Sequence, residues 1–366
     1  MLLYPSMGLP MLAQPDEELR RFGARVLNTY CAEAYAGYRD RLEPVAVIPM
    51  GTPEEAVEEL EVAVGRLGLR TVVMSGVIPR GVDRDGQPRA WIDTLGHGSL
   101  YDYDPVWAKC LELGVAPTFH GVGYGWGTRA SATNYVYNHL GNFASAQESV
   151  CRSLVMAGVP RCFPGLRFAF LEGGVSWGCQ LLADLLGRWE KRNGEAVRRF
   201  DPRRFDLQQA RALLAEFGRG RIAEGAAAYL EAAAAAAAVP APPDPRTSDD
   251  FADALVSKPE DLVEIFERQF FFGCEADDPL NALAFDRRLL PHGARLNAVF
   301  ASDIGHWDVP DMREVLPEAW ELVEDGRLGL DEFRDFSFGN VARMLTDVRP
   351  DFFEGTAVAD AVRGLR

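Results

Sequence analysis

Three side chains that can bind a metal ion or transfer a proton stand at or near the ends of apolar runs. With the run in which each lies, they are His120 (APTFHG), Glu172 (LRFAFLEGG) and Asp303 (NAVFASD). If these runs are parallel strands of one barrel, their carboxyl ends meet at one rim and the three groups share a pocket. Asp and His clusters bind zinc, manganese or iron, and the ion activates water or polarises a substrate oxygen. The pattern therefore predicts a metal-dependent reaction site.

Each of these residues also has a structural explanation. His120 alone could be a hydrogen-bonded residue at a strand end, and Glu172 could anchor the turn at the two glycines that follow it. Asp303 could cap the next helix, and His306 could simply pack against Trp307. Their common position at strand ends is what favours chemistry over structure.

Residues in the connections after the strands complete the candidate site. His139, in TNYVYNHLGNF, could bind substrate or act in acid–base catalysis if a helix begins there, although a locally bonded surface histidine fits equally well. His97 and Arg129 lie in loops and could bind an anionic group of the substrate. Trp177, shortly after Glu172, is a further candidate for substrate binding.

The elements that would position these groups follow one repeated pattern of apolar run, capped helix and next apolar run. Thr52, Pro53 and Glu55 form a capping box with proline at the first helical position. Apolar residues at helical spacing then continue to Gly68, where the helix is expected to end. The apolar runs are continuous rather than alternating, which is typical of parallel strands covered on both faces.

The apolar runs predict seven strands. They are MLLYPS, VAVIPM, TVVMSG, APTFHG, LRFAFLEGG, RQFFFGCE and NAVFASD. Seven is one fewer than in the closed barrel of eight strands. We therefore expect an α/β fold of the (β/α)8 TIM-barrel type that lacks one strand–helix unit at its N-terminus. Such an open barrel would expose unpaired backbone on its edge strands.

A long connection follows the sixth barrel strand. It contains an amphipathic pattern near 178–193, an alanine-rich segment at 220–238 and the linker PAPPDPRTSDD. We expect residues 178–250 to form a helical insertion in a single barrel domain that spans 1–366. Two further long connections, at 77–103 and 121–141, follow strands and are expected to help build the site.

Composition narrows the classes of partner. The formal charge is −16, with 54 acidic residues against 38 Lys and Arg, which disfavours nucleic acid and anionic membranes. The six cysteines form no C-x-x-C pair, as is common for reduced thiols in a cytosolic protein. The N-terminus lacks the basic region of a signal peptide, and the alanine run is too short to span a bilayer. We expect a soluble, cytoplasmic protein without a membrane partner.

Taken together, the segments APTFHG, GVPRCFPGLRFAFLEGGVSW, FASDIGHWD and FGNVARML resemble the amidohydrolase-2 branch of the metal-dependent amidohydrolase superfamily. This branch includes aminocarboxymuconate-semialdehyde decarboxylase and resorcylate decarboxylases. The resemblance implies that His120 and Asp303 bind the metal, that Asp303 can also handle a proton, and that His306 supports the pocket. Glu172 stands where many decarboxylases of the family have histidine. The H-x-H pair that normally ends the first strand does not occur in this chain.

These observations lead to one main expectation and two alternatives. We expect metal-dependent hydrolysis or non-oxidative decarboxylation of a small, carboxylated cyclic or aromatic substrate, with Asp303, Glu172 and His139 in catalysis. Zinc is the expected ion, with manganese and iron as alternatives, and the resemblance also implies a possible homodimer. The missing H-x-H pair favours instead a metal-free barrel that acts as a binding or scaffold protein. A lyase or hydratase at the same site is the third candidate.

Overall fold

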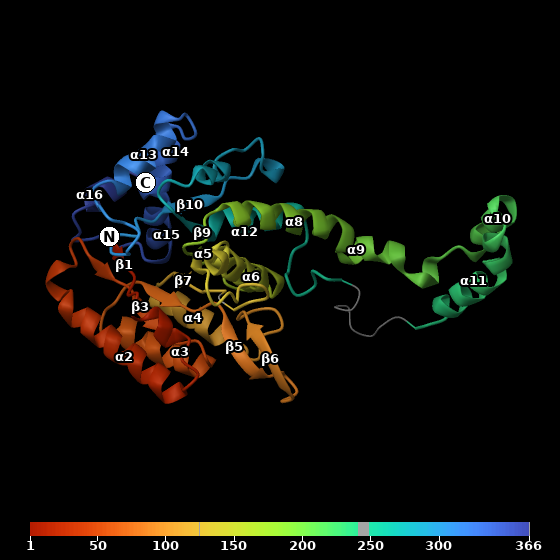
Figure 1. Ribbon diagram of the computed structural model, residues 1–366, viewed down its shortest axis with the longest axis horizontal. Helices are drawn as coiled ribbons and strands as arrows, with labels where there is room; N and C mark the ends of the chain where they lie inside the picture. Colours follow the sequence, from red (N-terminus) through yellow and green to blue (C-terminus); the bar gives the residue numbers. More distant parts are fainter. Residues whose placement is uncertain (124, 241–248, 366) are drawn as a thin grey trace. The chain divides into compact units, whose positions relative to one another are not determined.

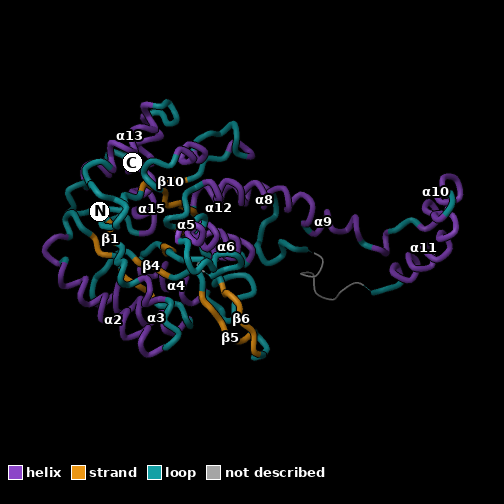
Figure 2. Tube along the Cα trace, viewed as in Figure 1, coloured by secondary structure: helices purple, strands orange, loops and turns teal. Residues whose placement is uncertain are grey.

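The computed structural model describes residues 1–123, 125–240 and 249–365. Contacts divide the chain into two compact units, one of Met1–Ala183 with Glu260–Arg366 and the other of Asp184–Pro259. Figures 1 and 2 trace the helices and strands of both units. Among the described residues, no helix combines the length and apolar character that a membrane crossing requires.

The first unit is built on a parallel sheet of six strands. In chain order these are β3 (Ala46–Ile48), β4 (Val72–Met74), β7 (Pro117–Phe119), β8 (Phe168–Phe170), β9 (Phe270–Cys274) and β10 (Asn297–Phe300), and neighbours in this order are paired. A further strand, β1 (Leu2–Leu3), pairs in parallel with β2 (Glu43–Pro44) directly before β3. All seven predicted strands are therefore present. The described strands follow one another as in a (β/α)8 fold, but they form an open array rather than a closed ring.

Helices cover both faces of the sheet, which explains why its strands are continuously apolar. On one face, Ala169 and Phe271 are paired in register and pack with Met344 and Leu345 of α15 (Asn340–Val348). Asn340 Nδ2 donates to the carbonyl oxygen of Ala298 in edge strand β10 at 2.7 Å.

The other face carries a row of stacked or tilted rings, Phe119, Phe170 and Phe272. Trp107 from α4 (Asp104–Leu113) and Phe266 from α12 (Pro259–Arg268) pack against this row. The apolar core thus lies on both sides of the strands and fixes the direction in which their carboxyl ends point.

The helices of the first unit lie between its strands and after the last of them. They are α1 (Leu9–Leu12), α2 (Glu17–Ala34), α3 (Pro53–Leu60), α4 (Asp104–Leu113), α5 (Tyr135–His139), α6 (Asn142–Met156), α7 (Val159–Cys162), α12 (Pro259–Arg268), α13 (Val315–Glu324), α14 (Leu330–Arg334), α15 and α16 (Ala359–Arg363), with α8 (Ser176–Arg192) spanning the unit boundary. The capping box of Thr52 and Glu55 is present. After α3 the chain continues as a π-helix, Glu61–Arg66, before Gly68 with φ of 71°.

The connection at 77–103 contains two strands that the sequence analysis missed. They are β5 (Ile78–Val82) and β6 (Pro88–Asp93), paired antiparallel. Asp83 accepts from two backbone N–H groups in the turn, and Gly86 has a φ of 74°. An Asp-Gly step between two extended runs is a recognised hairpin signal, so the sequence did contain the information.

The second unit is helical. Its α-helices are α9 (Gly194–Val197), α10 (Leu207–Phe217) and α11 (Arg221–Ala237), together with the last residues of α8. The helices α8 and α11 lie where the sequence predicts an amphipathic and an alanine-rich helix. Of the predicted linker, residues 241–248 lie outside the described part of the chain. That the whole chain forms a single domain stays a prediction.

Candidate active site

A cavity of about 470 Å³ lies at the carboxyl ends of β8, β9 and β10. Glu172 follows β8, Glu275 follows β9, and Asp303 follows β10; all three line the cavity. Residues of α5 and α6 line it as well, including His139. The parallel sheet thus brings groups from distant parts of the sequence to one opening.

Glu172, Asp303 and His306 form a compact group of possible metal ligands. One ligand atom from each lies within 4.8 Å of the other two. Nδ1 of His306 donates to the carboxylate of Asp303 at 2.8 Å, and Nε2 of the same ring lies 3.3 Å from Oγ of Ser6, which follows β1. His120 joins the group through Glu172, whose carboxylate accepts a hydrogen bond from Nε2 of His120.

The other ring nitrogen of His120 is available for binding. Nδ1 is buried and has no hydrogen-bond partner among the described residues. Because an ionised Glu172 can only accept, the proton of a neutral His120 ring lies on Nε2 and Nδ1 keeps its lone pair. An unpartnered buried acceptor is costly, so this nitrogen gains from any cation or donor that reaches it.

The backbone at the two carboxylates is in an unusual conformation. Glu172 has a φ of 61° and Asp303 a φ of 47°. For residues other than glycine this left-handed region costs roughly 1–2 kcal/mol. Such conformations cluster at functional sites, where the position of the side chain outweighs the backbone cost.

The carboxylates around the cavity shift one another's protonation. Burial raises the pKa of Asp303 above its usual value, although His306 opposes this shift. Burial alone would lower the pKa of His306, but the hydrogen bond to Asp303 and nearby carboxylates raise it overall. Glu275 is exposed by area, yet the surrounding protein crowds its carboxyl group. This loss of hydration, reinforced by Asp303 and Glu172, raises the pKa of Glu275 to about 7.

A series of aromatic rings in successive contact extends from Trp307, which is exposed, to His120, which contacts Glu172. The successive ring centroids are Trp307 to Tyr135 at 6.3 Å, Tyr135 to His139 at 4.9 Å, His139 to Phe143 at 5.3 Å and Phe143 to His120 at 5.4 Å. Tyr135 and His139 are four residues apart on α5 and therefore lie on one face of that helix. His139 thus lines the cavity beside other aromatic rings.

Three other predicted substrate contacts lie elsewhere, because their local structure directs them away from this cavity. His97 is exposed after β6, and its backbone N–H donates to α6. Arg129 donates through Nη2 to the carbonyl oxygen of Leu140, within its own loop. Trp177 of α8 packs against Phe272 in the core at 5.2 Å between ring centroids. None of the three is among the described residues that line the cavity, and their roles in substrate binding stay predictions.

Two residues of the site were missed by the sequence analysis. Glu275 follows the run RQFFFGC, so the rule that selected Glu172 and Asp303 would have selected it too. Ser6, which ends MLLYPS, sits at the corresponding end of β1. The position at a strand end was the available signal for both.

The residues present fit a divalent cation. Two carboxylates and an imidazole within 4.8 Å are ligands that zinc and manganese accept. His120, predicted as a metal ligand, contacts Glu172 through Nε2 but is not one of the three residues of this group.

Comparisons with known proteins identify the family. The Amidohydrolase family model (Amidohydro_2) matches residues 8–225. No curated protein sequence matches the chain significantly.

Solved structures share the fold at low sequence identity. 5-Carboxyvanillate decarboxylase from Sphingomonas paucimobilis is 15% identical, with a TM-score of 0.51 over 94% of this chain and 78% of that chain. Dihydroxybenzoic acid decarboxylase from Polaromonas sp. JS666, with bound manganese and the inhibitor 2-nitroresorcinol, is 15% identical, with a TM-score of 0.52 over 94% and 81%. An amidohydrolase from Mycobacterium avium subsp. paratuberculosis K-10 is 18% identical, with a TM-score of 0.53 over 94% and 70%. The family model covers more than half of the sequence, and on this ground the chain belongs to the amidohydrolase family.

Proposed function

We propose that this chain is a metal-dependent enzyme that hydrolyses or non-oxidatively decarboxylates a small cyclic or aromatic substrate. The observation that carries the proposal is the grouping of Glu172, Asp303 and His306 within 4.8 Å beside a cavity of about 470 Å³. The left-handed backbone at both carboxylates supports it, because such conformations cluster at functional sites.

Glu172, Asp303 and His306 would hold the ion. His120 would position Glu172 through the hydrogen bond from its Nε2. When bound, a divalent ion polarises a substrate oxygen or lowers the pKa of bound water. Zinc remains the first expectation. Manganese is supported by the related decarboxylase whose structure contains it.

Proton transfer falls to the chain's own carboxyl groups. The pKa of Glu275 is about 7, so this group can exchange a proton near neutral pH, and burial raises the pKa of Asp303 above its ordinary value as well. In hydrolysis one of them would take a proton from the attacking water. In decarboxylation one would deliver a proton to the ring carbon that loses CO₂. His139 lines the cavity and is a further candidate for this role.

The names of related proteins favour decarboxylation. Two of the structures described above are decarboxylases of carboxylated aromatic acids, which supports a carboxylated substrate for this chain. The metal-free binding or scaffold protein remains the alternative, because the chain has no H-x-H pair. A cytoplasmic location and a homodimer remain predictions from the sequence.

Metal loading followed by turnover tests the proposal. The full chain is reconstituted with Zn²⁺ or Mn²⁺, its metal content is measured, and CO₂ release from 5-carboxyvanillate and 2,6-dihydroxybenzoate is assayed beside a panel of cyclic amides. We expect about one metal ion per chain, since such a site binds one ion, and turnover that is lost in Asp303→Ala. Metal content below about a tenth of this would favour the scaffold alternative. Turnover that survives in Asp303→Ala would refute the assigned site.

A further inference from the structure

The cavity combines an aromatic wall with an excess of negative charge. Six acidic residues line it, namely Glu172, Glu275, Asp277, Asp303, Asp308 and Glu318, and no Lys or Arg is among the described lining residues. A carboxylated substrate alone would meet repulsion in such a cavity, whereas a positively charged group would be attracted.

A bound divalent ion does not remove this excess. The ion would offset two charges, those of Glu172 and Asp303. The outer carboxylates of Asp308 and Glu318 form no ion pair with Lys or Arg within the described ranges 1–123, 125–240 and 249–365. Their charge therefore faces the cavity and solvent without a basic partner.

Two aromatic side chains, Trp307 and Tyr135, line the same cavity as these carboxylates. Trp307 and Tyr135 are 79% and 54% exposed, and their centroids lie 6.3 Å apart in an edge-to-face arrangement. Trp and Tyr faces attract organic cations, by about 0.5–1 kcal/mol at exposed positions. Asp308 directly follows Trp307, so a carboxylate and the ring come from one segment.

We propose that the substrate carries a positively charged nitrogen group, held between the Trp307–Tyr135 rings and the carboxylates of Asp308 and Glu318. The inference rests on the proposed function, since it describes the substrate of the same site. It is compatible with a carboxylate elsewhere on the molecule, which the metal would face. The substrate class is thus a small cyclic or aromatic compound with an ammonium or similar cationic substituent.

Three probes of one shape test this proposal without turnover. Benzylammonium, benzyl alcohol and benzoate are titrated by calorimetry into the full chain, with and without Mn²⁺. In the Mn²⁺-loaded protein we expect benzylammonium to bind at least about tenfold more tightly than benzyl alcohol, as one cation–π contact and two carboxylates together would give. Broadening of the probe's proton resonances by Mn²⁺ reports whether it lies near the metal.

Matched variants locate the effect. The double variant Asp308→Asn with Glu318→Gln should weaken benzylammonium at least about fivefold and leave benzyl alcohol unchanged. Glu321→Gln, on the same helix α13 but not among the lining residues, is the control and should change neither. Trp307→Ala should weaken benzylammonium more than benzyl alcohol.

The results that would contradict the cationic substrate differ from those that would contradict the proposed function. Equal affinity for the ammonium and the alcohol in the Mn²⁺-loaded protein, or no saturable binding of either, refutes the cationic substrate. The same holds if the preference exists only without Mn²⁺, because the probe would then only replace the metal. The proposed function fails separately, if the chain binds no Mn²⁺ and benzoate binds equally with and without it.

Discussion

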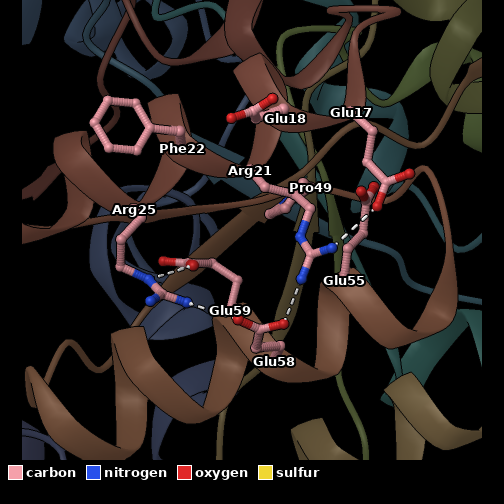
Figure 3. Close-up of a pocket in the computed structure, with 9 residues that line it drawn as sticks. All are labelled: Glu17, Glu18, Arg21, Phe22, Arg25, Pro49, Glu55, Glu58 and Glu59. Carbon is pink, nitrogen blue, oxygen red and sulfur yellow. Dashed lines mark hydrogen bonds and ion pairs between the residues drawn. The ribbon is translucent and has the colours of Figure 1, made fainter.

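Two cavities of almost equal size differ in how the charges of their lining residues are paired. The groove between α2 and α3 has a volume of about 460 Å³ and the cavity at the strand ends about 470 Å³, and both are lined by several carboxylates. In the α2–α3 groove, Arg21 and Arg25 reach across to Glu58 and Glu59 and pair with them (Figure 3). In the strand-end cavity, no Lys or Arg is among the described lining residues.

The pairing of charges distinguishes a functional cavity from a structural groove better than the cavity volume does. In the α2–α3 groove, Arg side chains of the protein itself pair with Glu58 and Glu59, so these carboxylates are already partnered without a ligand. At the strand-end cavity, carboxylates without a Lys or Arg partner, the raised pKa values of Asp303 and Glu275, and the left-handed backbone at Glu172 and Asp303 are costs that suit a functional site. The four predictions below use this contrast, in order of decreasing effect.

The largest effect on stability is expected beneath the α2–α3 groove. Arg20 forms two hydrogen bonds to Glu55, of 3.1 and 2.8 Å, and the two side chains are only 10% and 1% exposed. Arg20→Ala would leave the buried carboxylate without its partner, which typically costs about 3–5 kcal/mol. Chemical denaturation should show this loss in the free energy of unfolding. Arg20→Met with Glu55→Gln, which removes both charges, should recover part of it.

At the strand-end cavity, substitution should affect metal binding rather than stability. Asp303→Asn removes one anionic ligand and keeps a side chain that tolerates the left-handed backbone. We expect Mn²⁺ affinity to fall at least about 100-fold, beyond the 10–100-fold effect of outer-shell changes, while the melting temperature is maintained or rises. Calorimetric titration and thermal denaturation measure the two quantities. A loss of stability like that of Arg20→Ala would remove the contrast between the regions.

Glu275, which lines the strand-end cavity, should make the stability of the chain depend on pH. Its pKa in the folded chain is about 7 against 4.5 ordinarily, so the folded state binds the proton more tightly than the unfolded state does. The free energy of unfolding should therefore fall as the pH rises from 4.5 through 7. In the metal-free chain, Glu275→Gln should be more stable than the parent at pH 8 by about 1 kcal/mol, a value reduced because the group is exposed. This advantage should shrink as the pH approaches 4.5, which denaturation at a series of pH values would show.

Sequence patterns located seven strands but missed the hairpin of β5 and β6, and they did not show the backbone conformation that orients the site. Continuous apolar runs located all seven strands, and their last residues located Glu172 and Asp303, because parallel strands end at one rim. The same rule would have located Glu275. The left-handed backbone at Glu172 and Asp303 could not be predicted from the sequence, since residues other than glycine seldom adopt it.

Loops were predicted least well, for a related reason. His97 and Arg129 were assigned to the site because their residue types suit anion binding. The sequence did not show that the backbone of His97 donates to α6 or that the side chain of Arg129 donates to Leu140 in its own loop. The position of α15 against the sheet was equally hidden, because an amphipathic pattern shows that a helix packs without showing its partner.

The smallest effect is expected from the exposed ion pairs of the α2–α3 groove. Glu58 pairs with Arg21 and, at 3.6 Å, with Arg25, but its side chain is 54% exposed. Water and salt screen such pairs, so Glu58→Gln should cost no more than about 0.5–1 kcal/mol in unfolding free energy, and less at high salt. Denaturation at low and high salt measures this. A cost above about 2 kcal/mol, insensitive to salt, would mean that these carboxylates are as dependent on their partners as Glu55, and the contrast between exposed paired charges and the strand-end cavity would be lost.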